Sequence, residues 1–233
     1  MAPKRPSLPT ALRVKSVRRE SSINWPLLVL VGLVVFGTAK RLPLPTGKTG
    51  ASRKPRVNVE WSDEDAQAFV AAVKAAGVPV DAALNVYAAE SGLDPQASSG
   101  IAWGLAQFVG KTLKGLGWQR SAAEFGGLSV AEQAPWVTKL LKSQVAMLGR
   151  APSSALDLYV LNFWPAAARA GYDVILVRDS RVARERQAYE ANKGFDRAGK
   201  GYITRGDLQT ALDRVVHLPA LGRVQAQIRR LAA

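Results

Sequence analysis

Apolar and polar positions repeat with a helical period along most of the chain after residue 60. Ser62 followed by three acidic residues is typical of a helix N-cap, and Gly77 should end that first helix. A second helix is predicted from about Val80 to Glu90, with Gly92 as its stop. Alternation typical of strands is nearly absent, so we predict a mainly α fold. Further helices are expected from Ser129 to Leu148 and at about 153–162, 165–177, 180–190, 205–216 and 219–231.

The first 58 residues have a different pattern. Residues 1–22 are polar and basic, and we predict a disordered leader there. Residues 23–39 carry no charge, and a helix of that length is about 25 Å long, the short end of what spans a bilayer. We interpret 23–39 first as a single transmembrane helix; the alternatives are a signal peptide cleaved near Ala39 and a buried core helix. Residues 40–58 are rich in Pro, Gly and basic side chains and are predicted to be a linker.

The net charge of +14 makes nucleic acid a class of partner to consider. Residues 1–60 hold 12 Lys and Arg against two Glu, so a net charge of +10 falls there and only +4 on the other 173 residues. The basic charge therefore lies outside the predicted helical domain. This distribution favours a membrane surface or a cell wall as partner, and we expect no nucleic acid to be bound.

Residue types that build many catalytic and metal sites are scarce in this chain. It has no Cys, which excludes disulfides and Cys-based metal sites, and its only His is His217. Nothing near His217 indicates a catalytic triad or a multi-His site. Sites built on Cys or on several His are therefore not expected in this chain.

Glu90 is the candidate for that chemistry. It ends an Ala-rich, mostly apolar helix just before a loop of Gly, Pro and Ser. A partly desolvated carboxyl keeps its proton to higher pH, which is the property of a general acid for glycosidic bonds. An exposed Glu at a helix end is the structural alternative. Gly104 and Gln107 follow in a second short motif; glycine allows close approach of the backbone, and an amide suits sugar hydroxyl and acetamido groups.

The two motifs together, ESGLDPQASS at 90–99 and GLAQ at 104–107, resemble the SLT family of lytic transglycosylases, which are goose-lysozyme-like. There are departures: Ile101 stands where the family usually has Gly, Ala106 where it has Met, and the loop is one residue shorter. The segment 158–165 is similar to that of phage-encoded members. The resemblance implies that Glu90 is the catalytic acid/base. It implies substrate-binding roles for Ser91, Ser99, Gly104, Gln107, Tyr159, Asn162 and Phe163, with core packing as the alternative for Tyr159 and Phe163.

The resemblance also implies an activity that needs a single carboxylate and neither a metal nor a cofactor. Glu90 would protonate the oxygen between N-acetylmuramic acid and N-acetylglucosamine, and then take a proton from the muramoyl 6-hydroxyl to close a 1,6-anhydro ring. Asp94 is not paired with Glu90, because Gly92 should break the helix between them. The expected partner is peptidoglycan, and the expected place is the host inner membrane or a virion, with the domain facing the periplasm. A hydrolytic muramidase and a non-catalytic lysozyme-fold protein of a membrane or virion are the alternatives.

A second pattern lies near the C-terminus. Residues 196–207 have the outline of an EF-hand loop, with Asp196 at the first position and Gly201 at the sixth. The third and fifth positions are Ala198 and Lys200, which supply no carboxylate. We predict a degenerate EF-hand-like helix–loop–helix, with calcium binding as the alternative. The whole arrangement is then a lysozyme-like transglycosylase domain at 59–180 and a helical extension at 181–233.

Overall fold

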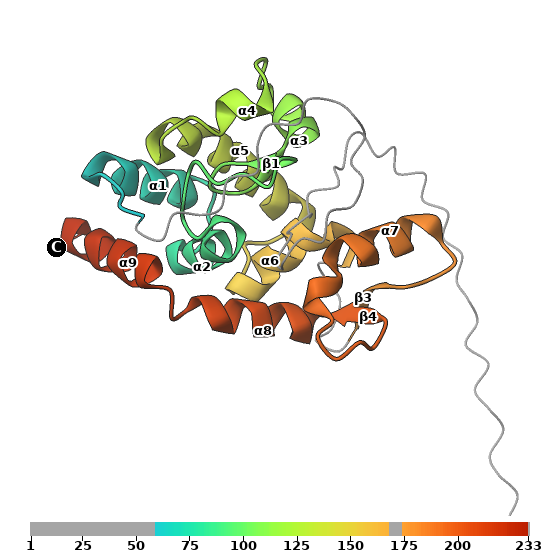
Figure 1. Cartoon of the computed structure of the whole chain (residues 1–233). Coiled ribbons are helices and arrows are strands. Elements are labelled where there is room, and N and C mark those ends of the chain that lie inside the picture. The colour runs from blue at the N-terminus through green and yellow to red at the C-terminus, as the bar shows by residue number, and fades with distance from the viewer. Residues whose placement is uncertain (1–58, 168–173, 233) are drawn as a thin grey trace, which may run out of the picture.

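A computed structural model describes residues 59–167 and 174–232 (Figure 1). The predicted leader, transmembrane helix and linker, at 1–22, 23–39 and 40–58, lie outside the described residues. The described part is mainly helical, as predicted. Its α-helices are α1 (Asp63–Ala75), α2 (Val80–Ser91), α3 (Gly110–Gly115), α4 (Ala122–Phe125), α5 (Val130–Leu148), α6 (Ala155–Phe163), α7 (Ala183–Asn192), α8 (Arg205–Val215) and α9 (Pro219–Ala232).

Helix starts and stops follow the polar residues that the sequence places there. Ser62 and Ser129 accept from the backbone of the third helical residue and form capping boxes with Asp65 and Glu132, which fixes the starts of α1 and α5. Helix α2 ends at Gly92, which adopts the left-handed conformation with φ 64°. The predicted break after Glu90 is therefore confirmed.

Helices α2 and α6 lie at the centre of one hydrophobic core. Helix α1 packs on α5, α2 packs on α6, and the C-terminal α8 and α9 pack against α2, α6 and α1 (Figure 1). The largest fully buried side chains include Tyr87 of α2, Tyr159 of α6 and Phe69 of α1. Residues of the segment after 180, such as Leu208 and Val224, belong to this same core. The C-terminal helices α8 and α9 thus pack directly against the two central helices, α8 on both α2 and α6 and α9 on α2.

Four short strands stand where the sequence predicted helix or loop. Strands β1 (Ala102–Trp103) and β2 (Phe108–Val109) form a small antiparallel hairpin. The helix predicted at 165–177 is wrong where the structure describes it: Pro165–Ala167 forms a 3-10 turn, η1, and Ile175–Arg178 forms strand β3, while 168–173 lie outside the described residues. Strand β3 pairs antiparallel with β4 (Tyr202–Thr204), with Val177 opposite Ile203. The apolar run at 174–177 is rich in β-branched residues, which favour a pleated strand.

The predicted helix–loop–helix near the C-terminus is present. It comprises α7, the 3-10 turn η2 (Lys193–Phe195), the loop with β4, and α8. The Asp196 carboxylate accepts from the backbone N–H groups of Lys200 and Gly201, at 2.9 and 2.7 Å. The Lys200 ammonium lies 2.8 Å from Asp207. A lysine ammonium thus pairs with the carboxylate at the twelfth position of a loop that has the outline of a calcium loop.

Membrane-spanning length is a separate question from fold class. Within the described ranges, no single helix is long and apolar enough to cross a membrane. Helices α1 and α2 meet that test only as a pair, bent by 115° at the break between them.

Candidate active site

Glu90 lies in the last turn of α2, and its side chain is partly exposed. Its nearest polar partner is Asn162 on α6, whose Nδ2 donates to Oε1 of Glu90 at 3.3 Å. Asn162 itself is 2% exposed. The packing of α2 on α6 therefore brings a carboxyl and an amide together across 72 residues of sequence.

A second amide lies behind Asn162. Gln144 on α5 is 3% exposed, and its Nε2 donates to Oδ1 of Asn162. Because an amide NH₂ group only donates, this bond fixes which end of Asn162 faces Gln144 and leaves Nδ2 for Glu90. Gln144, Asn162 and Glu90 thus form a chain of hydrogen bonds from α5 through α6 to α2. The sequence did not predict Gln144 as a site residue.

Two buried tyrosines complete the polar surroundings of Glu90. Tyr87 and Tyr159 are both fully buried, and neither hydroxyl has a hydrogen-bond partner within the described part of the chain. Burial raises the pKa of each hydroxyl far above its usual range, and the charge of Glu90 raises the pKa further. Both tyrosines are consequently neutral at physiological pH, and their presence adds no charge beside Glu90.

The surroundings of Glu90 favour its protonated form. Desolvation raises the pKa of Glu90 to about 8, while the hydrogen bond from Asn162 acts in the opposite direction. At neutral pH the carboxyl therefore holds a proton, and it can become a carboxylate without a large change in pH. A group with this pKa can donate a proton in one step and accept one in the next.

The loop after Glu90 is held in a strained conformation. Leu93 and Gln107 have positive φ angles of 66° and 49°, which non-glycine residues rarely adopt. The Gly104 N–H donates to the Ala97 carbonyl at 2.9 Å, and Ser98 bridges to Trp103 of β1. These bonds fold the loop back on itself beside the C-terminal end of α2. Backbone strain of this kind is often found at functional sites.

Gln133 fastens this loop to α5, and sequence reasoning missed it. The fully buried Gln133 amide accepts from Leu105 N–H at 2.8 Å, and it donates to the carbonyls of Pro95 at 2.7 Å and Leu128 at 3.0 Å. A Cβ on Gly104 would lie 2.5 Å from the Gln133 Oε1 atom. Gly104 is therefore required for this close approach, which is a packing role rather than an approach to sugar.

Ser99 and Gln107 also shape the loop. The Ser99 hydroxyl accepts from Ala102 N–H at 3.1 Å. The Gln107 Nε2 atom donates to the carbonyls of Ala97 and Gly104, at 3.2 and 2.9 Å. Both side chains are partly exposed. They lie in the loop that follows Glu90 in the chain, and in this structure their hydrogen bonds hold the loop's backbone.

Three other predicted substrate-binding residues have side chains inside the protein. The Ser91 hydroxyl is fully buried and donates to the Tyr87 carbonyl at 3.0 Å. Phe163 is 5% exposed and packs edge-on against Phe195, with ring centroids 5.6 Å apart. Tyr159 packs on the same phenylalanine. These side chains offer no surface to a sugar, and their predicted binding role has no support in the geometry.

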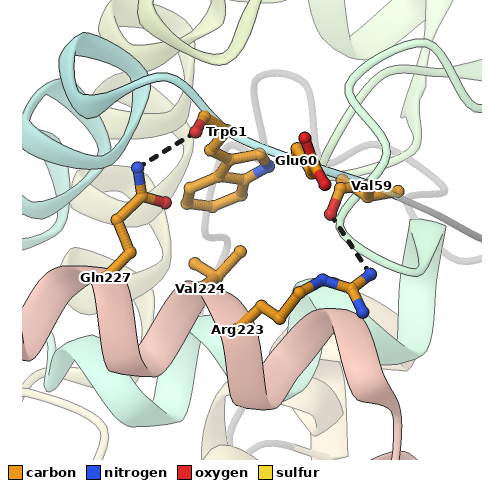
Figure 2. A pocket seen from close by; sticks show the side chains of 6 residues that line it. All are labelled: Val59, Glu60, Trp61, Arg223, Val224 and Gln227. Atoms are coloured by element: carbon orange, nitrogen blue, oxygen red, sulfur yellow. Dashed lines mark hydrogen bonds between the residues drawn. The ribbon is translucent and has the colours of Figure 1, made fainter.

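The hollow drawn in Figure 2 lies between the segment before α1 and helix α9. Its volume is about 200 Å³, and Trp61 and Val224 form its apolar wall. The Gln227 Nε2 atom donates to the Trp61 carbonyl at 3.0 Å across it. None of the predicted site residues lines it. Trp61 also contacts the loop that follows Glu90, because its Nε1 donates to the Leu93 carbonyl at 2.9 Å.

Metal ligands are not gathered at this site. Within 59–167 and 174–232, no three or more Asp, Glu or His side chains form a group that could hold a metal ion. None of the protein-family models, curated proteins or solved structures compared with this chain matches it. Its function must therefore be inferred from the geometry around Glu90.

Proposed function

We propose that this chain is a peptidoglycan lytic transglycosylase with a lysozyme-like fold, in which Glu90 is the only catalytic acid/base. The observation that carries the proposal is the Glu90 carboxyl itself. Desolvation raises the pKa of this partly exposed carboxyl to about 8, and Asn162 contacts it at 3.3 Å. An acid that is protonated at neutral pH and can then serve as a base suits cleavage of a glycosidic bond.

Asp94, the acidic residue nearest to Glu90 in sequence, is engaged elsewhere, which supports an intramolecular reaction. It is 1% exposed, and its Oδ1 accepts from the Gln96 N–H at 2.9 Å in the turn after α2. Asp94 therefore serves the loop rather than standing opposite Glu90. Most glycosidases use two carboxyl groups, the second acting as nucleophile or as base for water. With a single acid/base, the 6-hydroxyl of the substrate itself can supply the nucleophile.

The reaction that follows begins with Glu90 protonated. Glu90 donates its proton to the oxygen between N-acetylmuramic acid and N-acetylglucosamine as the bond from muramoyl C1 to that oxygen breaks. The muramoyl acetamido oxygen forms a transient bond to C1 as the leaving sugar departs. The 6-hydroxyl then attacks C1 and displaces the acetamido oxygen, and Glu90 takes the hydroxyl proton. The products are a 1,6-anhydromuramoyl end and a free N-acetylglucosamine end, and Glu90 is protonated again.

Mass spectrometry of the products tests this proposal against its two alternatives. Purified sacculi are treated with the full chain, and the soluble fragments are weighed. Fragments with anhydromuramoyl ends are expected, which are about 18 Da lighter than the hydrolysed fragments because no water is added. Fragments with reducing muramoyl ends would identify a muramidase and contradict the ring closure. No soluble fragments at all would favour a non-catalytic protein with this fold.

We also propose that residues 23–39 anchor the chain in a membrane, with the helical domain in the periplasm or on a virion where peptidoglycan is reached. The support is the uncharged run of 23–39 between two basic segments. Protease added to spheroplasts is expected to digest the helical domain and spare the membrane segment. A domain that resists protease until the cells are broken open would contradict this orientation.

A further inference from the structure

Gln144 is a buried amide whose hydrogen bonding is only half complete. Its Nε2 donates to Asn162, but its Oε1 is buried and has no hydrogen-bond partner within the described residues. A buried acceptor without a donor costs stability, and an apolar side chain of similar length would avoid that cost. Leu140, Leu141 and Leu148 of the same helix are apolar and buried. A polar residue at this core position therefore calls for a reason other than packing.

The contact with Asn162 supplies that reason. An asparagine amide has an accepting end and a donating end, and either can face a neighbour. Gln144 presents a donor, so the Oδ1 atom of Asn162 turns toward α5 and its Nδ2 atom turns toward Glu90. A donor facing Glu90 stabilises the carboxylate. The opposite orientation would place Oδ1 against Glu90 and would favour only the protonated carboxyl.

We propose that Gln144 is a positioning residue that acts through Asn162, fixing the Asn162 amide so that Glu90 can lose its proton as well as hold it. The inference rests on the proposed function, because a group that is acid in one step and base in the next needs both forms within reach. Among the titratable groups of the packed elements, Tyr87 and Tyr159 interact with Glu90, and both stay neutral. The amide pair is therefore the polar element that moves the balance toward the carboxylate.

The test is a direct titration of Glu90 in the full chain. Glutamate labelled with ¹³C at the carboxyl carbon gives one resonance per residue, and Glu90→Gln identifies the resonance of Glu90. Gln144→Met, which keeps the length of the side chain but removes its amide, is expected to raise the pKa of Glu90 by about 0.5 or more. Asn162→Leu is expected to raise it by about 1. An unchanged pKa in Gln144→Met overturns the proposal.

A double variant shows whether Gln144 acts through Asn162. If it does, Gln144→Met adds nothing to the pKa change that Asn162→Leu causes alone. A further rise in the double variant contradicts the proposal. This comparison also serves if Gln144→Met alone does not fold, because the double variant replaces both amides by apolar groups. Thr112→Val is the matched control: Thr112 is buried on α3, its hydroxyl has no hydrogen-bond partner among the described residues, and its loss should leave the Glu90 pKa unchanged.

Activity measurements separate this inference from the proposed function. Gln144→Met is expected to lower kcat while leaving KM nearly unchanged, and to move the upper limb of the kcat profile to higher pH. If wild-type protein releases no muropeptides but the Glu90 pKa responds as described, the proposed function fails and the positioning role stands. If wild-type protein is active and Gln144→Met changes neither the pKa nor the pH profile, the positioning role fails and the proposed function stands.

Discussion

The Asn162 amide nitrogen lies 3.3 Å from the Glu90 carboxyl oxygen, although 72 residues separate the two in sequence. The contact exists because α2 ends at Gly92 and α6 runs beside it in the core. Burial and this hydrogen bond act on the Glu90 carboxyl in opposite directions, and burial dominates. The pH dependence of activity and stability should follow from the balance between these two effects. The contacts that hold the loop after Glu90 should contribute to the stability of the protein.

Activity should fall as pH rises through the pKa of Glu90. The first step needs a proton on Glu90, and the pKa of that carboxyl is about 8. Above this value the protonated fraction drops about tenfold for each pH unit, and kcat/KM should drop with it. Initial rates of solubilisation of labelled sacculi between pH 5 and pH 10 measure this limb. A kcat/KM that already falls from pH 5 upward would contradict a raised Glu90 pKa.

Removing the Glu90 charge should stabilise the protein at high pH. The folded-state pKa of Glu90 is about 8, against an ordinary value of 4.5, so the folded state binds the proton more tightly than the unfolded state does. Stability from this group is therefore complete below about pH 4.5 and is lost as pH rises through about 8. Glu90→Gln, which stays neutral, should therefore gain about 4 kcal/mol of stability relative to wild type between pH 5 and pH 9.

Denaturant unfolding at several pH values measures this difference. The matched control is Glu64→Gln on α1, which makes the same change at an exposed position. A difference between Glu90→Gln and wild type that stays constant from pH 5 to pH 9 would show that Glu90 is not desolvated.

Loss of Gln133 should destabilise the protein and release the loop. Its amide makes three hydrogen bonds to the backbone of the loop and the segment before α5, and it is fully buried. Gln133→Leu leaves these buried backbone groups without partners, which should cost about 2 to 4 kcal/mol. Gln119→Leu, at an exposed position with one long hydrogen bond of 3.3 Å, should cost less than about 0.5 kcal/mol. Equal losses in the two variants would refute the role of Gln133.

The Lys200 ammonium should make the wild-type loop stable without calcium. Its ammonium lies 2.8 Å from Asp207, and that hydrogen bond raises the pKa of Lys200. Replacing both Ala198 and Lys200 by Asp would supply carboxylates at the third and fifth loop positions. The double variant should gain a Tm that rises with added Ca²⁺, whereas the wild-type Tm should respond to neither Ca²⁺ nor EDTA. A wild-type Tm that rises with Ca²⁺ would contradict this account.

Local signals were enough to predict long helices such as α1, α2 and α5 and to single out Glu90 as a candidate, but not the contacts between helices. Ser62, Ser129 and Gly92 mark helix ends by short-range chemistry, so their roles are visible in the sequence. Gln133 and Gln144 were missed because a polar residue on a long amphipathic helix is typical of a surface position. Only the packing of α5 turns both amides inward, and that packing depends on residues far away in sequence.

The loop residues illustrate the same limit. The sequence predicted substrate-binding roles for Gly104 and Gln107, but it did not indicate that Gly104 makes room for Gln133 or that Gln107 binds the loop's own carbonyls. The strand at 175–178 was predicted as a helix because an apolar run of four residues is too short to show its period. Its partner, β4, is the feature that makes it a strand.

The most direct measurement of the central claim is muropeptide release from purified sacculi by full-length wild type, Glu90→Gln and the control Glu64→Gln. The Glu90→Gln change keeps the size of the side chain but removes its ability to donate and then accept a proton. The account predicts that Glu90→Gln loses at least roughly a hundredfold in rate while Glu64→Gln stays at the wild-type rate. Release by Glu90→Gln at the wild-type rate would show that Glu90 is not the catalytic acid/base.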